Sequence, residues 1–577
     1  MIWWIENHQR FKQEREALEA LAARDNWLTP LKWRIDDSAR VVWDADISVP
    51  AGNRPISLIY PNHFPFSPPI VLPRGDNTRW SQHQYGSGGE LCLEYGPDNW
   101  HQDISGADMI ESAHRLLEGE EPERGVAAEV ASRHATTIGQ DFRPTISRFL
   151  ITRALDEELR SLPEGVVANA SIACIFRRGE CIVHVIASLT FPDGRTWNDE
   201  VPDVAMLGFA DTIALFRLPG DKPFPPTRSL TDFRAAIAAL GLALPDVRDV
   251  VIVAGESVRA FFLNNDSNSV AESAIIPPQP SVPRLDKEHE ALAGRKVAIV
   301  GCGSLGSKVA VMLARSGVGK FLLVDDDLFF PDNLVRHDLD WRDVGIHKAD
   351  SVARRIKLVS PAADCSVRKR RLGGQESSGS IESLLKSLAE CDMIIDATAE
   401  ASVFNYLCAA VAISKKPMVW AEVFGGGFGG MIARYRPSRE PDPASMRRAI
   451  ENWCADQGKV LPRPAHRYGG EPDAPAIADD ADVTVIAGNA ARMAIDLLIP
   501  RDPSMFPHSV YLIGLAEGWI FDQTFETRPI DVGPPAAAEP DDAEDLAEAE
   551  AELEFVKRLF SEYEDAASGG TASNQAP

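Results

Sequence analysis

The sequence predicts a multidomain protein with an N-terminal α+β domain, an α/β middle domain and a C-terminal doubly wound α/β domain. Its 577 residues exceed what a single hydrophobic core can organise. From Lys296 onward a strand, a glycine turn, a helix and a second strand follow one another, whereas the proline-rich stretch 276–284 has the composition of a linker. We therefore predict domains at 1–140, 141–285 and 286–535, and an acidic tail at 536–577.

In the N-terminal domain, a helical pattern at 5–23 precedes strand-like alternation at 33–35, 40–47 and 55–60. A second helix is predicted at 106–117. Helices at both ends of a run of strands are typical of an α+β domain.

The middle domain is predicted from apolar runs at 170–176 and 181–189, a helix at 230–242 and a buried strand at 249–254. This mixture indicates an α/β domain. We find no catalytic constellation in it.

The C-terminal domain shows short apolar strands at 297–300, 321–324, 393–396 and 417–422, with helical segments between them. Such alternation predicts parallel strands joined by crossover helices, which is the doubly wound arrangement.

The composition excludes several classes of partner. A formal net charge of −26 argues against a nucleic-acid partner. The eight cysteines include no Cys-x-x-Cys pair, which predicts neither disulfides nor structural zinc and favours the cytoplasm. The N-terminus lacks the apolar core of a signal peptide, and no apolar run approaches the ~18 residues of a membrane span, so no membrane is expected.

Part of the negative charge lies in the tail, between Glu539 and Glu564. Apolar residues recur there with helical spacing, which predicts a short amphipathic helix. Such a helix is either a docking segment or part of a solvated acidic tail. The apolar positions are Leu553, Phe555, Val556, Leu559 and Phe560.

A nucleotide site is predicted at the first strand of the C-terminal domain. Gly301, Gly303 and Gly306 form a G-x-G-x-x-G turn between this strand and a helix, and Asp325 ends the next strand. The glycines let the backbone approach a phosphate at the helix N-terminus, and the carboxylate can accept hydrogen bonds from ribose hydroxyls.

The residues after Asp325 favour ATP over a dinucleotide. Asn333, Arg336 and Lys348 can hold a triphosphate and stabilise departing pyrophosphate. The carboxylates Asp327 and Asp396 can hold Mg²⁺. A hydride-transfer site needs none of these groups, so a dinucleotide oxidoreductase is disfavoured.

Together, these motifs resemble the ThiF and ubiquitin-activating adenylation domain over residues 288–530. The resemblance implies that Gly301, Gly303, Gly306 and Asp325 bind ATP. It also implies that Asn333, Arg336 and Lys348 manage the phosphates and that Asp396 carries Mg²⁺. The sequence departs from the family in lacking the paired zinc cysteines of many relatives, and an N-terminal arginine lent across the dimer cannot be placed.

Adenylation makes a mixed anhydride, which a thiolate can convert to a thioester. Cys454 is the predicted nucleophile in this domain because Arg447 and Arg448 could favour its thiolate and because the family places a cysteine there; the alternative is a cysteine without a role. The nearby glycines at 425–430 either admit a narrow peptide tail or form a flexible loop. Cys302, Cys391 and Cys408 are expected to be structural.

A second nucleophile is predicted in the N-terminal domain. The run Tyr60 to Pro69, then His83, Gly89-Glu90-Leu91-Cys92 and Asn99-Trp100 resemble a ubiquitin-conjugating domain over residues 30–120. The resemblance implies that Cys92 is the thioester acceptor and that the tryptophan packs beneath it.

One departure from that family concerns the oxyanion. The family's His-Pro-Asn is replaced by His83-Gln84-Tyr85, which removes the expected asparagine. What the tetrahedral intermediate needs is a positioned hydrogen-bond donor. Tyr85, Asn99 and His101 are the candidates.

This domain order resembles the fused conjugation enzymes of bacterial anti-phage CBASS operons. The resemblance implies a homodimer that activates the C-terminal tail of a cGAS-like nucleotidyltransferase with ATP and Mg²⁺, carries it as a thioester and joins it to an amine-bearing acceptor, with Arg336, Cys454 and Cys92 as catalytic residues. The alternatives are conjugation of a bacterial ubiquitin-like protein, ThiF-like adenylation for sulfur transfer or cofactor maturation, and an inactive scaffold.

Overall fold

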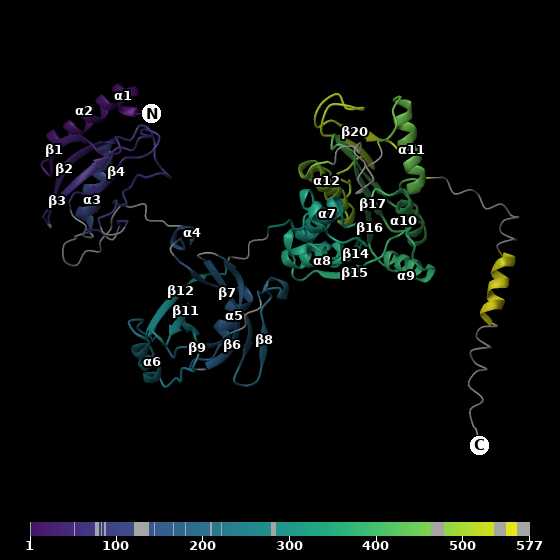
Figure 1. Cartoon of the computed structure of the whole chain (residues 1–577), viewed down its shortest axis with the longest axis horizontal. Helices are drawn as coiled ribbons and strands as arrows, with labels where there is room; N and C mark the ends of the chain where they lie inside the picture. Colours follow the sequence, from purple (N-terminus) through teal and green to yellow (C-terminus); the bar gives the residue numbers. More distant parts are fainter. Residues whose placement is uncertain are drawn as a thin grey trace, which may run out of the picture. The chain divides into compact units, whose positions relative to one another are not determined.

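The computed structural model describes most of the chain, which forms two compact units at 1–145 and 146–577 (Figure 1). The second unit contains two separate sheets, one formed by strands between 147 and 276 and one by strands between 296 and 530. The predicted division between them at 285 stays a prediction. The described residues are 2–50, 52–75, 80–81, 83–85, 88–120, 138–143, 145–165, 167–178, 181–207, 211–220, 222–278, 284–462, 478–535 and 550–561.

The N-terminal unit has the predicted α+β content. Its strands form a four-stranded antiparallel sheet in the order β1-β2-β3-β4. The helix predicted at 5–23 is broken at Asn7, whose side chain accepts a hydrogen bond from the Arg10 N–H and caps the longer helix. The elements are α1 (Trp3–Glu6), α2 (His8–Arg24), β1 (Leu28–Ile35), β2 (Val41–Val49), β3 (Gly52–Ile59), β4 (Ile70–Pro73), α3 (Gly106–Gly119) and α4 (Ile138–Asp141).

A buried carboxylate on α2 ties this unit together. Glu14 is 1% exposed and pairs with Arg10 at 2.9 Å. Its other oxygen accepts the Tyr60 hydroxyl at 2.8 Å and the Gly106 N–H at 2.7 Å. Glu14 therefore joins α2, the end of β3 and the start of α3 through one side chain, and its charge is compensated as a buried charge must be.

The middle sheet closes on itself. Because β5 pairs with both β12 and β7, seven strands form a ring in the order β5-β12-β11-β10-β9-β6-β7, and β8 extends it. The helices α5 and α6 contribute to two different apolar cores. The elements are β5 (Ser147–Leu150), α5 (Arg153–Ser161), β6 (Val167–Arg178), β7 (Cys181–Thr190), β8 (Thr196–Asn198), β9 (Asp211–Arg217), α6 (Leu230–Ala239), β10 (Asp249–Ala254), β11 (Ser257–Asn264) and β12 (Ser269–Ile276).

The middle domain is thus richer in strands than predicted. The strands that sequence analysis missed include β11 and β12, each of which has several exposed or half-buried residues. In β12 polar residues interrupt the apolar ones, and in β11 the apolar run is only the four residues 260–263, so the pattern on which the prediction depended was weak.

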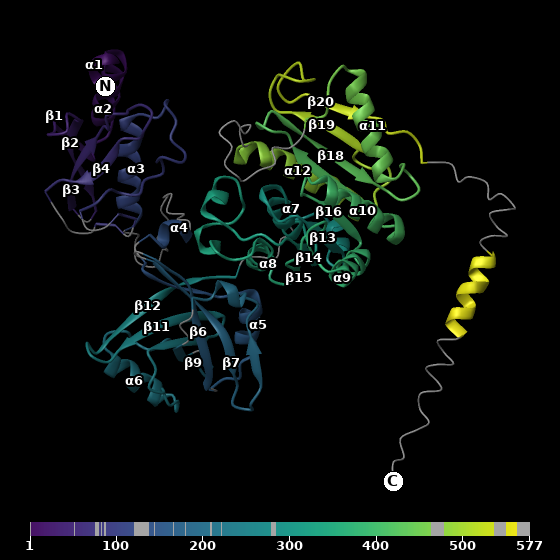
Figure 2. The same ribbon diagram turned by 45° about the vertical axis from the view of Figure 1, so that its right-hand side comes forward.

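The C-terminal sheet confirms the predicted doubly wound fold. Its order is β15-β14-β13-β16-β17-β18-β19-β20, with the first five strands parallel (Figure 2). Helices α7, α8 and α12 contribute to the core on one face, and α9, α10 and α11 to the core on the other. The elements are β13 (Lys296–Val300), α7 (Ser304–Arg315), β14 (Lys320–Val324), α8 (Lys348–Val359), β15 (Asp364–Arg368), α9 (Ser378–Ala389), β16 (Met393–Asp396), α10 (Ala401–Ser414), β17 (Met418–Val423), β18 (Gly429–Tyr435), α11 (Pro443–Asp456), α12 (Asp480–Leu498), β19 (Val510–Gly514) and β20 (Thr527–Ile530).

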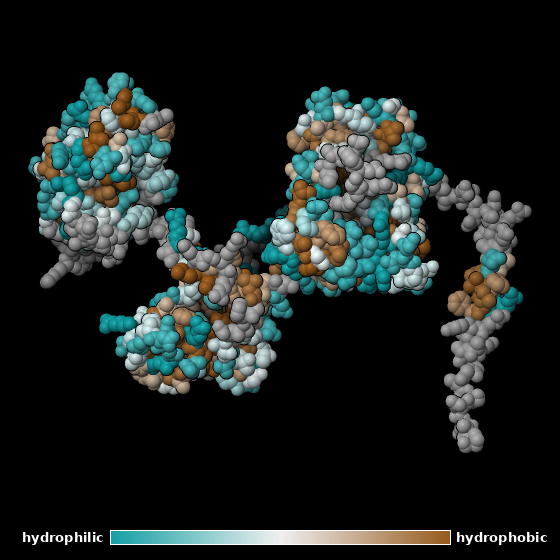
Figure 3. Space-filling view, in the orientation of Figure 1, coloured by the Kyte–Doolittle hydropathy of each residue, from teal (hydrophilic) through white to brown (hydrophobic). Residues whose placement is uncertain are grey.

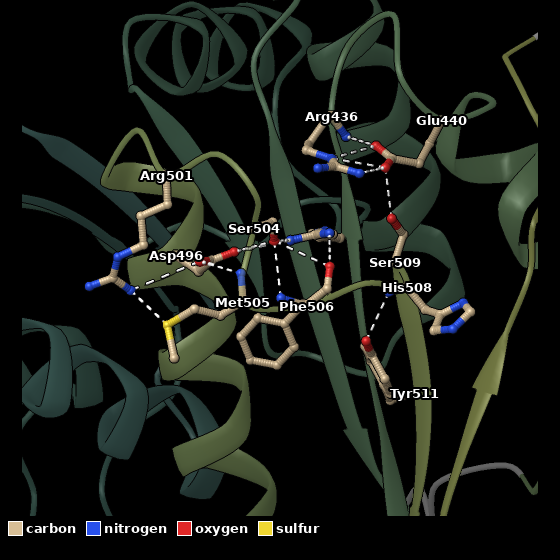
Figure 4. A network of polar contacts seen from close by, with 11 residues as sticks. Arg436, Glu440, Asp496, Arg501, Ser504, Met505, Phe506, His508, Ser509 and Tyr511 are labelled. Carbon is tan, nitrogen blue, oxygen red and sulfur yellow. Dashed lines mark hydrogen bonds and ion pairs between the residues drawn. The ribbon is translucent and has the colours of Figure 1, made fainter.

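A buried ion pair joins β18 to α12. The Arg434 and Asp496 side chains are each 1% exposed and lie 3.2 Å apart. Arg434 also donates to the Ser504 hydroxyl at 2.7 Å, and the Met505 N–H donates to Asp496 at 3.0 Å (Figure 4). This network fixes the loop before β19 against the end of α12.

The tail contains the predicted helix, at residues 550–561. Its five predicted apolar side chains are exposed and give the helix an apolar patch (Figure 3). Across the described part of the chain, no helix has both the length and the apolar character to cross a bilayer.

Candidate nucleotide site

A cavity of about 790 Å³ lies at the carboxyl ends of the parallel strands of the C-terminal sheet. It opens where β13 is flanked by β14 on one side and β16 on the other, which is the topological switch point of this fold. Of the predicted nucleotide-binding residues, Gly306 alone does not line it. The predicted residues that line it are Gly301, Gly303, Asp325, Asp327, Asn333, Arg336 and Lys348.

The three glycines of the turn are required for different reasons. Gly301 has φ +87°, and a Cβ there would lie 2.9 Å from the Thr398 methyl group. A Cβ on Gly306 would lie 1.8 Å from the Gly301 carbonyl oxygen. A Cβ on Gly303 would meet nothing within 4 Å, so this position is open toward the cavity.

Asp325 fixes the shape of this turn. Its carboxylate accepts the Cys302 N–H at 2.7 Å and the Asp327 N–H at 2.8 Å. Burial raises the pKa of Asp325, and these hydrogen bonds oppose that rise. Each carboxylate oxygen has a second lone pair, so Asp325 can still accept from ribose hydroxyls as predicted.

His337 is a positioning residue to which the sequence motif had assigned no separate role. Its Nε2 lies 2.8 Å from the Cys302 carbonyl oxygen, and the Leu339 N–H donates to Nδ1 at 3.3 Å. Burial lowers the pKa of His337 to about 4, so the ring is neutral near pH 7. Nε2 therefore carries the proton and donates to the turn, and both ring nitrogens are satisfied.

Lys348 and Asn333 are held in place by backbone groups. The Lys348 ammonium lies 2.8 Å from Asp327, and the Lys348 N–H donates to the Asp327 carbonyl at 2.9 Å. The Asn333 amide oxygen accepts the Phe330 N–H at 2.9 Å, which leaves its NH₂ group as the donor. Together with Arg336, these residues present a set of donors that fits phosphate oxygens.

The lining of the cavity contains more acidic than basic side chains. Six carboxyl groups face four basic groups, so a triphosphate entering this site would meet repulsion unless a divalent cation accompanied it. The acidic residues are Asp325, Asp326, Asp327, Asp332, Glu400 and Glu422, and the basic residues are Arg336, Lys348, Arg370 and Arg371.

Asp396 differs from its prediction, because it does not line this cavity. Its carboxylate accepts the N–H and the hydroxyl of Thr398 at 2.9 and 2.7 Å and lies in a small adjoining pocket with Glu422 and Arg447. Burial raises the pKa of Asp396 to about 6.

The magnesium role of Asp396 stays a prediction, since Asp396 lines the adjoining pocket, which shares Glu400 and Glu422 with the cavity. Within the described ranges, no three His, Cys, Asp or Glu side chains are grouped closely enough to hold a metal. Glu400, which follows the same strand, does line the cavity and pairs with Arg371 at 2.9 Å. Glu400 and Asp327 both line the cavity, and Asp327 pairs with Lys348 at 2.8 Å.

Three of the glycines at 425–430 are closely packed, whereas Gly425 lines the cavity and a Cβ on Gly426 would meet nothing within 4 Å. A Cβ on Gly427 would lie 2.2 Å from the Asp482 carboxylate, one on Gly429 2.5 Å from the Ile513 carbonyl, and one on Gly430 2.5 Å from the Glu422 carbonyl. Close packing explains these three glycines, whereas sequence analysis had offered a peptide channel or a flexible loop.

Cys454 lies in the hydrophobic core, on the inner face of α11 with Met446 and Ile450. Burial raises the pKa of its thiol to about 11, and Glu451 adds to the rise. The expectation that neighbouring arginines favour its thiolate is therefore wrong for this conformation. Arg447 instead approaches Glu422 at 3.9 Å.

Cys92 lies in the segment that connects β4 to α3 in the chain and is 3% exposed, and its N–H donates to the His83 carbonyl at 2.7 Å. The Trp100 indole N–H donates to the Pro65 carbonyl at 2.7 Å. Arg10 donates to the Ile104 carbonyl at 2.8 Å and so fixes the segment after Cys92 to α2.

The three candidate oxyanion donors differ in their surroundings. Asn99 is engaged locally, since its NH₂ group donates to the Glu94 carbonyl and its oxygen accepts the Gly96 N–H, both at 2.8 Å. Tyr85 is 60% exposed, and His101 is exposed beside Asp103. Asn99 therefore shapes the loop after Cys92, and Tyr85 and His101 stay as the candidates with exposed side chains.

Comparison with known proteins agrees with the C-terminal fold. Residues 281–467 match the ThiF family. The chain is 35% identical over 126 residues to the ATP-dependent ubiquitin transferase-like protein Cap2 of Pseudomonas aeruginosa, a match that covers 20% of each protein. It is 24% identical over 502 residues to the uncharacterized protein y4qC of Sinorhizobium fredii, covering 77% of this chain and 82% of that one. The crystal structure of E. coli MccB with ATP aligns at 18% identity and a TM-score of 0.33, over 43% of this chain and 67% of that one.

Proposed function

We propose, from the match of residues 281–467 to the ThiF family, that the chain uses ATP to activate the C-terminal carboxylate of a partner protein and then transfers it through thioesters. The alignment to the Pseudomonas Cap2 protein spans only a fifth of that protein's length, so the activity of the whole chain rests on its own residues.

The observation that carries the proposal is the composition of the cavity. The glycine turn, Asp325, Asn333, Arg336 and Lys348 come from separate segments, and all of them line one space at the switch point. A dinucleotide site would need the turn and the acidic residue but not the phosphate-binding set.

Adenylation would proceed by attack of a carboxylate oxygen of the partner on the α-phosphorus of ATP. The new bond is the acyl–phosphate bond, the bond between the α-phosphorus and its bridging oxygen breaks, and pyrophosphate leaves with the electron pair. Lys348 and Arg336 would neutralise charge on the leaving group, and the Asn333 amide would orient it. A magnesium ion bound with the phosphates would supply further neutralisation, and Glu400 and Asp327 are the side chains that could hold it.

Thioester formation would then need a thiol to attack the acyl carbon, with AMP as the leaving group. Cys92 is our proposed final acceptor because it lies next to a loop shaped by Asn99 and anchored through Arg10. The N-terminal helices, the four-stranded meander and the helix after Cys92 support a ubiquitin-conjugating-like role for this unit. Cys454 could act as an intermediate carrier only if α11 moved, since its thiol is buried in the core, and Cys92, which is 3% exposed, would also have to become accessible before it could accept the acyl group.

We further propose a biological setting from the similarity to Cap2, which is named as a ubiquitin transferase-like protein. In this setting the chain is a homodimeric enzyme of a CBASS operon. It activates the tail of a cGAS-like nucleotidyltransferase and joins it to an amine. A bacterial ubiquitin-like partner, or sulfur transfer as in ThiF relatives, is the alternative, and the presence of Cys92 favours conjugation over sulfur transfer.

The test is partner-dependent exchange of labelled pyrophosphate into ATP, followed by mass spectrometry of the protein with and without a thiol reductant. Lys348→Met should abolish exchange. Lys357→Met, on the same helix α8 but outside the cavity lining, should leave it unchanged. If the wild-type protein exchanges pyrophosphate but forms no thiol adduct, the hypothesis of sulfur transfer or cofactor maturation is favoured. If it exchanges pyrophosphate with no partner carboxylate, the adenylation hypothesis is wrong.

A further inference from the structure

The basic residues that line the nucleotide cavity come from two places in the sheet. Arg336 and Lys348 come from the region after β14, whereas Arg370 and Arg371 come directly after β15. In the sheet, β14 lies between β15 and β13 (Figure 2). The two arginines after β15 therefore approach the cavity from the side of β14 that faces away from β13 and its glycine turn.

The order of these strands fixes the direction of a bound nucleotide. The glycine turn at the end of β13 is the site for phosphate, and Asp325 at the end of β14 is the site for the ribose. Phosphates and base are attached to opposite sides of a ribose. A nucleotide that runs from the turn to Asp325 therefore continues with its base toward β15, which is about 4.8 Å further along the sheet.

Of the two arginines on that side, Arg371 is the one whose ion pair stays within the cavity. Arg370 pairs with Glu376 at 3.2 Å, and Glu376 does not line the cavity. Arg371 pairs with Glu400 at 2.9 Å, and both of these residues line it. Arg371 is therefore the cation that a base in this position would meet.

Glu400 holds Arg371 near the strand ends. Glu400 follows β16, and β14 and β13 lie between β15 and β16 in the sheet. The segment after β15 must therefore pass the ends of two strands to bring Arg371 to Glu400. Hydrogen bonding to Glu400 raises the pKa of Arg371, and Asp326 and Asp327, which follow β14, contribute to the rise. The guanidinium thus stays charged and lies close to the end of β14.

The flat faces of the Arg371 guanidinium are available to a ligand. Its side chain is 54% exposed, and Nη2 makes both hydrogen bonds to Glu400, at 2.9 and 3.1 Å. Hydrogen bonds from this nitrogen run along the edge of the group, so they fix its plane without covering its faces. A guanidinium is planar and stacks on aromatic rings, whose faces attract a cation.

We propose that Arg371, oriented by Glu400, stacks on the base of the bound nucleotide and makes the site prefer purine over pyrimidine nucleotides. The inference rests on the nucleotide site of the proposed function. A purine has two fused rings and a pyrimidine has one, so a purine offers the guanidinium the larger aromatic face. An arginine that contacted the phosphates instead would not discriminate between bases.

The experiment measures the dissociation constants of the full-length protein for ATP, CTP and inorganic tripolyphosphate, by titration calorimetry with Mg²⁺ present. Tripolyphosphate carries the phosphate groups without the ribose or the base. In Arg371→Met, we expect ATP to bind about tenfold more weakly, CTP at most about threefold more weakly, and tripolyphosphate within about twofold of the wild type. The retained affinity for tripolyphosphate also shows that the variant is folded.

Two further variants separate stacking from charge. Lys369→Met makes the same change of charge at a residue that pairs with Asp350 and does not line the cavity, so all three ligands should bind as they bind the wild type. Arg371→Lys keeps the charge without the planar group, so its ATP affinity should lie closer to that of Arg371→Met than to that of the wild type.

Equal losses of affinity for ATP and tripolyphosphate in Arg371→Met would assign Arg371 to the phosphates and overturn the proposal. A ratio of ATP to CTP affinity equal to that of the wild type would overturn it as well. In both cases the nucleotide site would stand. If the wild-type protein bound none of the three ligands, the nucleotide site itself would be wrong, and the proposed adenylation and this inference would fall with it.

Discussion

Gly306 and Gly303 belong to the same turn, yet the structure predicts that alanine at each position has a different effect. In Gly306→Ala, the new Cβ would lie 1.8 Å from the Gly301 carbonyl oxygen, whereas ordinary contacts are 3.4–4 Å. The turn and α7 must therefore separate by about 1.6 Å. Overpacking of this kind costs about 3 kcal/mol, and the better helix propensity of alanine returns about 1 kcal/mol. The expected net destabilisation is about 2 kcal/mol.

Gly303→Ala introduces a Cβ that meets nothing within 4 Å of the protein. Gly303 is the N-cap of α7 and has a negative φ of −77°, so alanine there should cost less than about 1 kcal/mol. Because the position lines the cavity, the methyl group should instead occupy space next to a phosphate. This variant should keep the fold and lose affinity for ATP.

Hydrogen exchange measured on peptides between 296 and 324 isolates this region from the rest of the chain. A loss of 2 kcal/mol corresponds to roughly 30-fold faster exchange of the most protected amides in Gly306→Ala. ATP binding measured on the same samples should fall at least tenfold in Gly303→Ala, without a change in exchange rate. The reasoning would be refuted if the amides of Gly306→Ala exchanged as slowly as those of the wild type, or if Gly303→Ala bound ATP as tightly as the wild type.

Three further predictions concern other parts of the molecule. Burial raises the pKa of Glu422 from 4.5 to about 7, so the folded chain keeps a proton that the unfolded chain releases. The free energy of unfolding of the wild type should therefore fall as pH rises between about 4.5 and 7, and in Glu422→Gln this fall should be smaller by at most about 3 kcal/mol. The same pH dependence of the unfolding free energy in both proteins from pH 4.5 to 8 would contradict this prediction. Arg434→Met removes the nearer counterion of the buried Asp496, leaves Arg501 at 3.9 Å as its ion-pair partner, and should cost about 3 kcal/mol in denaturant unfolding. The control Arg436→Met removes a pair whose arginine is 23% exposed and should cost less, so equal losses would disprove the distinction. Cys92→Ser should replace a reductant-sensitive adduct by a reductant-stable ester in mass spectrometry, and a persistent reductant-sensitive adduct elsewhere would show that Cys92 is not the final acceptor.

The C-terminal fold was predictable because its signals are local. The strands at 393–396 and 321–324 are short apolar runs that end at a polar residue, and the glycine turn connects one such strand to a helix. The cavity residues follow from this topology, since the carboxyl ends of parallel strands meet at one edge of a sheet.

The position of Asp396 could not be predicted from its motif. A strand-ending acid can point to either face of the sheet. In the structure, Asp396 is paired in register with Trp420, and its carboxylate is engaged by Thr398. The hydrogen bonds from Thr398 orient the Asp396 carboxylate, and the pattern of apolar and polar residues in a sequence does not predict such hydrogen bonds.

Cys454 shows a similar limit. The two arginines near it in the sequence suggested a stabilised thiolate, but helical spacing places Cys454 on the same face as Ile450, which is fully buried. The sequence contained this signal, because positions four residues apart share a face of a helix. His337 could have been assigned its role only from the fold, since its partner, the Cys302 carbonyl, is distant in sequence.

Glu14 determines where the N-terminal unit can be cut. The likeness to a conjugating domain begins near residue 30, and a fragment excised at that point would lose the acceptor of both the Tyr60 hydroxyl and the Gly106 N–H. Two buried donors would then have no acceptor, at a cost of about 1–3 kcal/mol each. An autonomous fragment for biochemical work must therefore begin before α2, and sequence similarity alone would place the cut in the wrong position.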